Sequence, residues 1–357
     1  MRNNLIILEV KKNILVAPLN WGLGHATRSI PIIWALEENG FNPIIASDGQ
    51  ALELLKKEFP HLLHLELPAY NIQYAEKGKN FKWKLLAQLP KMIKAIKSEK
   101  KQVAKWISEY QLSGIISDNR LGVYSKSIPS VFITHQLKVL TGTTSWITTK
   151  IHEFYIQKFN ECWIPDNDRS PNLSGELGHY YNGFKHLRYI GPLSRLHKRN
   201  LPLKYDIMVI LSGPEPQRTL LEQKLITEFQ LYAKPVLFVK GIITAEQEIW
   251  QENHITFYNF MNSEQLEIAF NESDKIVCRS GYTTVMDLAH LGKKAFFIPT
   301  PGQYEQEYLA KKYKTENLAP YCKQEKFKIE KIDKLEMYRG FQNFSKPVVW
   351  KDLFRLF

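Results

Sequence analysis

The chain has 357 residues, of which 44% are hydrophobic, and a formal net charge of +12. This length and apolar content suffice for two domains with separate cores. The three cysteines, Cys162, Cys278 and Cys322, lack CxxC or metal-ligand spacing, which argues against a cysteine metal site and favours a reduced, cytosolic compartment. The apolar run at 5–8 is too short for a signal peptide or membrane span, so we expect neither. The positive charge favours a polyanion or an anionic membrane surface as a partner.

The first predicted elements are a buried strand at 14–18, a glycine-bearing loop at 19–25, a helix at 28–39 and a strand at 44–46. Asp48 follows this second strand, which invites comparison with the dinucleotide-binding pattern GxGxxG and its distal acid. The comparison fails at Thr27, where the pattern requires a third glycine for close packing of helix against strand. We therefore predict no nicotinamide or flavin cofactor.

His25 is the last residue of the predicted glycine-bearing loop. An imidazole titrates near neutral pH, so at this position it is a candidate general base for an acceptor hydroxyl. The alternative is a histidine that stabilises the loop by bonding to its backbone. Arg28, three residues later, either orients an anionic acceptor or lies on the surface.

A long helix is predicted at 82–110, with an apolar stripe and eight lysines at 82–105 that are opposed only by Glu99. Such a helix either packs on the core with its lysines in water or rests on anionic lipid. Strands at 114–117 and 131–134 then end at Asp118 and His135. Because the carboxyl ends of parallel strands meet at one edge, both residues are further candidates for the base or for acceptor contacts; ordinary loop hydrogen bonding is the alternative.

A strand at 162–165 closes the predicted first sheet and is followed by Asp166-Asn167-Asp168. Two aspartates at this spacing can hold a divalent metal. Here, however, they precede a polar segment of Arg, Ser, Pro and Asn, which is the ordinary composition of a turn. We predict no metal site.

The second half of the chain repeats the strand and helix alternation. It is predicted to contain strands at 207–211, 236–239 and 256–260, a helix at 216–231, a loop at Ser212-Gly213 and a strand end at Met261. A second α/β domain follows from this pattern.

The stretch at 275–306 has the clearest chemical pattern. An apolar strand runs into Arg279-Ser280-Gly281, a helix ends at Gly292, and a second apolar strand follows at 295–298. The loop after the first strand directs backbone N–H groups and the positive end of the helix to one point, where a phosphate can bind. Nearby polar residues are Ser280, Thr283 and Thr284 as hydroxyl donors, Asp287 as a partner for a sugar diol, and Glu305 and Gln306 beyond the second strand.

The run from Cys278 to Asp287, with Gly292, Pro299 and Glu305-Gln306, resembles the donor-site signature of MurG-like glycosyltransferases. The resemblance implies the GT-B fold, in which two Rossmann-like, doubly wound parallel-sheet α/β domains face a cleft. It implies an acceptor-binding domain at 1–187, a donor-binding domain at 188–340 and a terminal helix at 341–357 that returns to the first domain. It also implies a UDP-sugar donor and inverting transfer without a metal or other cofactor.

By the same resemblance, His25 is the expected base, with Asp118 and His135 as alternatives. Family members often carry a glutamate after the histidine that corresponds to His135, and Gln136 departs from that pattern. The implied donor contacts are Ser212, Gly213, Met261, Ser280, Gly281, Thr283, Thr284, Asp287, Glu305 and Gln306. The implied acceptor contacts are Gly22, Gly24, Arg28, Asp118 and His135.

The sequence therefore predicts an enzyme that moves a hexose or N-acetylhexosamine from a UDP-sugar to an acceptor hydroxyl, with a lipid-linked or envelope glycan as one candidate acceptor. A UDP-sugar 2-epimerase of the same fold and a non-catalytic nucleotide-sugar-binding subunit are the alternatives. We expect a cytoplasmic protein, with the inner face of the cell membrane as a candidate peripheral site reached through the helix at 82–105. A nucleic-acid partner is not expected, because the lysines lie beside a core stripe without interleaved exposed aromatic residues.

Overall fold

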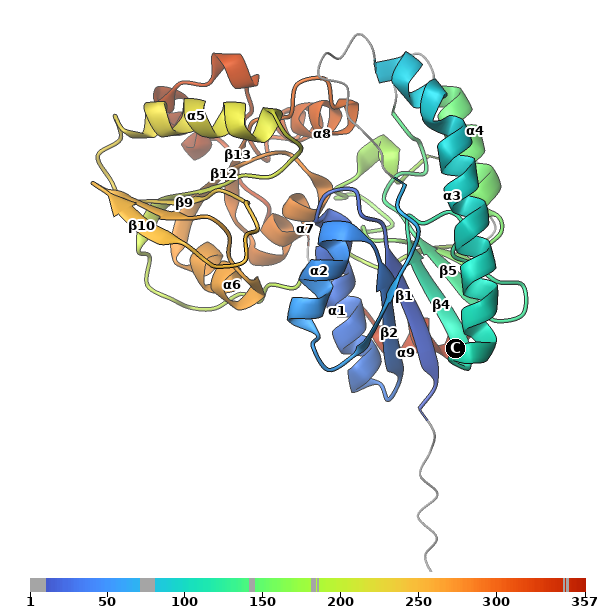
Figure 1. Ribbon diagram of the computed structural model, residues 1–357. Helices are drawn as coiled ribbons and strands as arrows, with labels where there is room; N and C mark the ends of the chain where they lie inside the picture. The colour runs from blue at the N-terminus through green and yellow to red at the C-terminus, as the bar shows by residue number, and fades with distance from the viewer. Residues whose placement is uncertain are drawn as a thin grey trace, which may run out of the picture.

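The computed structural model describes residues 11–70, 81–140, 145–180, 184, 186–342, 344 and 347–357. Two α/β domains lie side by side in Figure 1, and each is built on a parallel sheet. This confirms the predicted fold class. In the part of the chain that the structure describes, no helix is long and apolar enough to cross a membrane.

The first sheet has the strand order β3-β2-β1-β4-β5-β6-β7 and is parallel throughout. Its strands are β1 Asn13–Pro18, β2 Asn42–Ser47, β3 Leu63–Glu66, β4 Leu112–Asp118, β5 Ser130–Ile133, β6 Glu161–Ile164 and β7 Leu187–Tyr189. The central strands are apolar because helices cover both faces. These helices are α1 Gly24–Glu38, α2 Gly49–Glu58, α3 Phe81–Glu109 and α4 Ser145–Ile156.

The second sheet has the order β10-β11-β9-β8-β12-β13, in which β10 alone pairs in the antiparallel sense. Its strands are β8 Tyr205–Ile210, β9 Val236–Val239, β10 Ile249–Glu252, β11 Ile255–Tyr258, β12 Ser273–Cys278 and β13 Lys294–Phe297. The helices are α5 Gln217–Phe229, α6 Ser263–Asn271, α7 Tyr282–Leu291 and α8 Tyr304–Thr315. Short 3-10 helices include η3 Gly175–Leu177, η4 Gln324–Lys326 and η5 Ile329–Met337.

Two of the differences from the sequence-based expectation concern where an element begins or ends. The first helix begins at Gly24 rather than at residue 28, so His25 lies in the first turn of α1 and not at a loop tip. Strand β7 pairs with β6, so the first sheet extends two residues beyond 187, the expected end of the first domain. The N–H of Thr27 donates to the carbonyl of Leu23, so helical hydrogen bonding begins before residue 28. Residues 187–189 are held as a strand by their ladder with β6.

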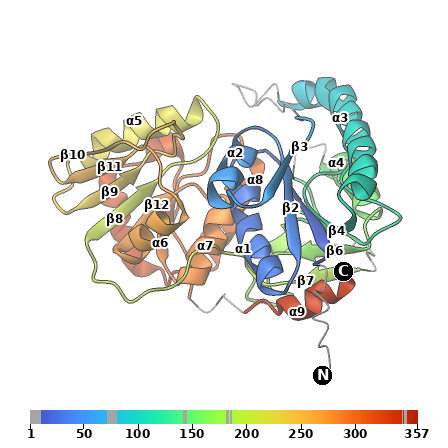
Figure 2. The same ribbon diagram turned by 60° about the horizontal axis from the view of Figure 1, so that its bottom comes forward.

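Helices α1 and α7 bring the two domains together (Figures 1 and 2). One buried apolar cluster contains residues from both helices, among them Ile33 and Val285. The chain ends with the short helix α9 Trp350–Leu353 and with η6 Phe354–Leu356. Phe354 packs edge to face on Phe41 of the first domain at 5.6 Å between ring centroids, so the chain end returns to the first sheet.

Candidate functional site

Charged side chains gather where β1, β4 and β5 end in the first domain. Asp118 is the last residue of β4, and His135 follows β5 by two residues. His25 and Arg28 lie one turn apart on α1 and therefore share a helix face. Arg28, Asp118 and His135 are all buried, with exposed fractions of 2%, 1% and 7%. The structure thus brings four of the predicted acceptor-side residues into one cluster.

Asp118 is the anionic centre of this cluster. Its carboxylate accepts hydrogen bonds from Nε and Nη2 of Arg28 and lies 2.8 Å from Nδ1 of His25. Burial alone would raise the pKa of Asp118, but the charge of Arg28, assisted by His25, lowers that pKa to about 2. Asp118 is therefore ionised at neutral pH.

His25 is held so that one ring nitrogen remains available. Nδ1 lies 2.8 Å from Oδ1 of Asp118 and 2.9 Å from Nη2 of Arg28. The carboxylate can only accept and Nη2 of Arg28 already donates to it, so we assign the proton of the neutral ring to Nδ1. Within the described residues Nε2 makes no hydrogen bond, and the side chain is 12% exposed. Burial and the nearby charge of Arg28 lower the pKa of His25 below its usual value. An unprotonated Nε2 at neutral pH is the form that a general base needs.

His135 links the cluster to the second domain. Its Nδ1 lies 3.0 Å from Nη1 of Arg28, and its Nε2 lies 2.8 Å from Oε1 of Glu305 in the first turn of α8. Its ring stacks on Tyr282 of α7, with 4.1 Å between centroids and 2° between planes. The side chain of Gln136 also donates to Glu305. No local sequence pattern indicates the contact between His135 and Glu305, because it joins positions 170 residues apart.

The second domain presents the amino end of α7 at the same interface. Gly281 is the N-cap of α7, and no side chain caps this end of the helix. Thr283 donates from Oγ1 to the carbonyl of Gly24 at 3.1 Å, so the amino ends of α1 and α7 touch. Added to Gly24, a Cβ atom would lie 2.8 Å from that hydroxyl, which explains why a glycine is required for this approach. Thr284 is partly exposed on the same turn.

Other predicted donor residues also make contacts within the protein. The buried hydroxyl of Ser280 donates to the carbonyl of Gln306 at 2.7 Å. The side-chain oxygen of Gln306 accepts from the backbone N–H of Thr300 at 2.8 Å, which shapes the turn after β13. Asp287 accepts from Ser194 of the interdomain linker at 2.7 Å, and burial raises the pKa of this carboxyl to about 6.

The remaining predicted residues lie in loops. Ser212 and Gly213 are exposed after β8, and Gly213 has a φ of +108° that favours glycine. Met261 follows β11 and is partly buried against the apolar core. Gly22 precedes α1 with a φ of +70°, and added side-chain atoms there would meet open space. Its left-handed backbone conformation is thus the reason for a glycine at this turn.

In the Asp166-Asn167-Asp168 tripeptide, the first carboxylate has a structural role. Asp166 is buried and accepts hydrogen bonds from the backbone N–H groups of Asn167, Leu173 and Ser174, and from the Ser174 hydroxyl. Its oxygens are therefore committed to ordering the loop. Among the described residues, no group of three His, Cys, Asp or Glu side chains is arranged to hold a metal.

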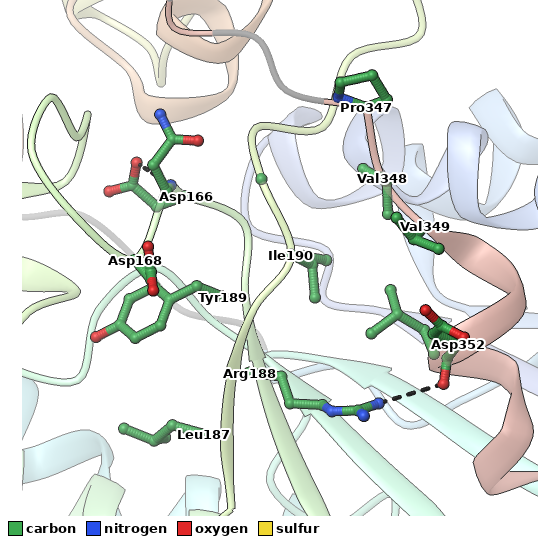
Figure 3. Close-up of a pocket in the computed structure, with 13 residues that line it drawn as sticks. Asp166, Asp168, Leu187, Arg188, Tyr189, Ile190, Pro347, Val348, Val349 and Asp352 are labelled. Atoms are coloured by element: carbon green, nitrogen blue, oxygen red, sulfur yellow. Dashed lines mark hydrogen bonds between the residues drawn. The ribbon is translucent and has the colours of Figure 1, made fainter.

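A separate cavity of about 460 Å³ lies between Asp168, β7 and the chain end (Figure 3). Arg188 extends across it and donates to the carbonyl oxygen of Asp352 at 3.4 Å. None of the predicted donor or acceptor residues lines this cavity. The cavity is therefore distinct from the interface between α1 and α7.

Comparisons with known proteins place these observations in a family context. Residues 222–339 match the C-terminal domain of glycosyltransferase family 28. A similar protein from Baumannia cicadellinicola subsp. Homalodisca coagulata is the UDP-N-acetylglucosamine--N-acetylmuramyl-(pentapeptide) pyrophosphoryl-undecaprenol N-acetylglucosamine transferase. It is 23% identical over 224 residues, 61% of this chain and 59% of that protein. The protein of the same name from Haemophilus ducreyi is 20% identical over 54% of this chain and 52% of its own length. The chain thus spans a little over half the length of these relatives.

Solved structures share the fold over nearly the whole chain. The glycosyltransferase of kitacinnamycin has a TM-score of 0.63 at 13% identity, with 97% of this chain and 94% of that chain covered. MurG from Acinetobacter baumannii has a TM-score of 0.55 at 14% identity, with 97% and 98% covered. The fold is therefore GT-B, as predicted. All of these matches are to transferases, so the epimerase and non-catalytic alternatives are not favoured.

Proposed function

We propose that this chain, a MurG-like member of glycosyltransferase family 28, transfers a hexose or N-acetylhexosamine from a UDP-sugar to an acceptor hydroxyl with inversion. One observation carries the proposal. The His25 and Asp118 pair stands at the first turn of α1, and that turn touches the uncapped amino end of α7 through Gly24 and Thr283, 3.1 Å apart. A candidate base and a candidate diphosphate site therefore adjoin each other across the interface.

In this mechanism the first domain removes a proton. Nε2 of His25 takes it from the acceptor hydroxyl as the oxygen attacks the anomeric carbon. Asp118 keeps Nδ1 protonated and stabilises the imidazolium that forms, so the ring stays in the productive tautomer. Arg28 keeps Asp118 ionised throughout, because it neutralises that carboxylate from the buried side.

The second domain stabilises the leaving UDP. Negative charge grows on the diphosphate as the sugar bond breaks, and the N–H groups at the amino end of α7 are fixed toward that charge. The hydroxyl of Thr284 adds a donor. Thr283 contributes its backbone N–H, because its hydroxyl donates to the carbonyl of Gly24. Asp287 would bind the ribose diol, and Glu305 the transferred sugar, through carboxylate lone pairs that their protein contacts leave open. Ser212, Gly213, Met261, Ser280, Gly281 and Gln306 complete the proposed donor site.

We infer that this chemistry needs no divalent metal. The positive end of α7 and the Thr284 hydroxyl supply the electrostatic stabilisation that a metal provides elsewhere. The one tripeptide with metal-like spacing begins with Asp166, whose oxygens already accept four hydrogen bonds from the protein.

We further propose a lipid-linked acceptor reached from the cytoplasmic face of a membrane. Helix α4 exposes large apolar side chains, with exposed fractions of 70% for Trp146 and 55% for Phe154. Lys150 lies between them on the same helix and is exposed. Apolar anchors beside lysines suit an anionic lipid surface.

The neighbouring α3 adds to this basic surface (Figure 1). It exposes six lysines between Lys91 and Lys105, and the only acidic residue in that range, Glu99, is buried against Arg120. The exposed charged residues of α3 from Lys91 to Lys105 are therefore all positive. The side chains of Lys82 and Lys84, which the sequence analysis assigned to the same basic helix, lie outside the described residues.

Sedimentation with phosphatidylglycerol vesicles tests the membrane proposal. Trp146→Asp and Phe154→Asp should each reduce vesicle binding. Leu231→Asp is the matched control, because Leu231 is 76% exposed on the second domain. Equal binding by all three variants and the wild type would count against a lipid-facing α4.

A nucleotide thermal-shift panel tests the transferase proposal. UDP at about a hundred times its dissociation constant should stabilise the protein by about 2.7 kcal/mol, enough for a clear rise in Tm. GDP, ADP and NAD at equal concentration should raise it less. A transition that no uridine nucleotide shifts would contradict the proposed donor site. UDP-sugars that bind are then assayed for UDP release with and without added acceptor, since an epimerase would need no acceptor.

A further inference from the structure

Glu305 belongs to the second domain, yet both oxygens of its carboxylate bind the first. Oε1 lies 2.8 Å from Nε2 of His135, and Oε2 accepts from Nε2 of Gln136. The side chain is 20% exposed. Burial alone would raise the pKa of Glu305, but His135 holds that pKa below its usual value, so the carboxylate is ionised. This is a charged contact made only while the domains touch.

The hydrogen bonds around His135 define its tautomer. A guanidinium can only donate, so Nδ1 accepts from Arg28 at 3.0 Å. Nε2 must then carry the proton of the neutral ring and donate it to Glu305. Tyr282 stacks on the ring and fixes its plane. Loss of the carboxylate would remove the acceptor that selects this tautomer.

Arg28 joins this histidine to the proposed base. The same guanidinium that donates to His135 also donates to Asp118, and Asp118 in turn orients His25. The five residues His25, Asp118, Arg28, His135 and Glu305 thus form one continuous hydrogen-bonded set, the interdomain network. Four of its members come from the first domain, and Glu305 alone comes from the second.

We propose that Glu305 is a positioning residue that ties the alignment of His25 to contact between the domains. With the domains together, its carboxylate holds His135 as the Nε2–H tautomer, which leaves Arg28 fixed on Asp118, the residue that orients His25. With the domains apart, that acceptor is withdrawn and the base is less well aligned. His25 therefore removes the acceptor proton most readily when the second domain has brought the bound UDP-sugar to the first domain. The inference rests on the proposed function.

A relocated carboxylate offers a sharp test. Glu305→Leu removes the acceptor, whereas Glu305→Gln keeps a neutral one. Nε2 of Gln136 already lies 3.5 Å from Nε2 of His135, so Gln136→Glu would place a carboxylate beside the same nitrogen from within the first domain. The double variant Gln136→Glu/Glu305→Leu should therefore restore the tautomer without the interdomain contact. Glu307→Leu is the control, because Glu307 is exposed on the same helix. Among the described residues its side chain accepts only from the backbone N–H of Gly302, at 3.0 Å.

The readout is the pair of ring ¹⁵N signals of His25 and His135, followed by kcat with a UDP-sugar that supports turnover. Glu305→Leu should shift both histidine signals and lower kcat by about a hundredfold, the cost of slight misplacement of catalytic groups. Glu305→Gln should lose less. The double variant should regain most of the histidine signals but only part of kcat, because Glu305 is also a proposed contact of the transferred sugar. Wild-type signals in Glu305→Leu, or no recovery in a double variant of unchanged Tm, would overturn the proposal. UDP binding is measured separately. A protein that does not bind UDP would count against the proposed function. The histidine signals would still test the role of Glu305, because they need no nucleotide.

Discussion

The two sides of the interface present different kinds of group. The first domain presents ionisable side chains at strand ends, centred on Asp118 and His25. The second presents the uncapped amino end of α7, with the hydroxyls of Thr283 and Thr284 beside it. Proton removal needs a group whose protonation changes, whereas a leaving diphosphate needs a fixed field of donors. In the function proposed above, the first side would remove the proton from the acceptor and the second would hold the leaving diphosphate.

The largest expected effect is on kcat and comes from a substitution in the first domain's charged cluster alone. Asp118→Asn should lower kcat on the order of 10³-fold or more, because an asparagine amide can donate to Nδ1 of His25 and stabilise the wrong tautomer. UDP affinity should not change. Asp48→Asn is the matched control, since Asp48 is also a buried aspartate paired with an arginine, Arg120. Wild-type kcat in Asp118→Asn would contradict the role of this pair.

A smaller effect, on the free energy of unfolding, is expected when a side chain is inserted between α1 and α7. The Cβ atom of Gly24→Ala would lie 2.8 Å from Oγ1 of Thr283, so the contact between α1 and α7 must yield. We expect a loss of about 1 to 3 kcal/mol in the free energy of unfolding, measured in urea. Gly24→Ala/Thr283→Ala should recover most of that loss, because the clashing hydroxyl is gone. An equal loss in both variants would show that the clash is not its cause.

The first side also sets the pH dependence. Burial and the charge of Arg28 lower the pKa of His25 below its usual 6.5, and only the unprotonated ring can act as a base. Activity should therefore persist as pH falls past 6.5 and decline at a lower pH. The profile of kcat/KM against pH measures this. An acidic limb with its midpoint above 6.5 would disagree with the geometry around His25.

The smallest effect concerns the second side and the stability of the fold. The pKa of Asp287 is raised to about 6 from 3.8, so the folded state binds this proton more tightly than the unfolded state. Its contribution to stability is thus present below pH 3.8 and is lost as pH rises through 6. Asp287→Asn cannot titrate, so wild type should lose stability relative to this variant between pH 4 and 6. Thermal melts of both proteins across that range measure the gap, and a constant gap would contradict the raised pKa.

The second side was largely predictable from sequence, because it is local. An apolar strand, Ser280-Gly281, a helix ending at Gly292 and another strand together indicate β12, α7 and β13. Alternation of apolar runs also predicted both parallel sheets. The antiparallel β10 was not predicted, since a four-residue edge strand is too short to show a clear alternation. Helix α4 was missed as well, because its exposed Trp146 and Phe154 blur the usual amphipathic pattern.

The first side was predicted residue by residue but not as a network. Strand ends indicated Asp118 and His135, and the glycine-bearing loop indicated His25. That Arg28 joins them depends on side chains from α1, β4 and β5 meeting in space. One signal was available: an arginine among Ala26, Ile30 and Ile33 on an apolar helix must have a buried partner. The Glu305 contact crosses the domain interface, and no local pattern encodes it.

Calorimetric titration of UDP into the wild type, His25→Gln and Asp287→Ala at one pH tests the division between the two sides most directly. The wild type and His25→Gln should bind UDP with the same Kd, because the proposed mechanism places His25 at the acceptor and not at the nucleotide. Asp287→Ala should bind about 10- to 100-fold more weakly, since a hydrogen bond to a charged group contributes about 1.5 to 3 kcal/mol. Loss of UDP binding in His25→Gln with full retention in Asp287→Ala would contradict the assignment of donor and base to opposite domains.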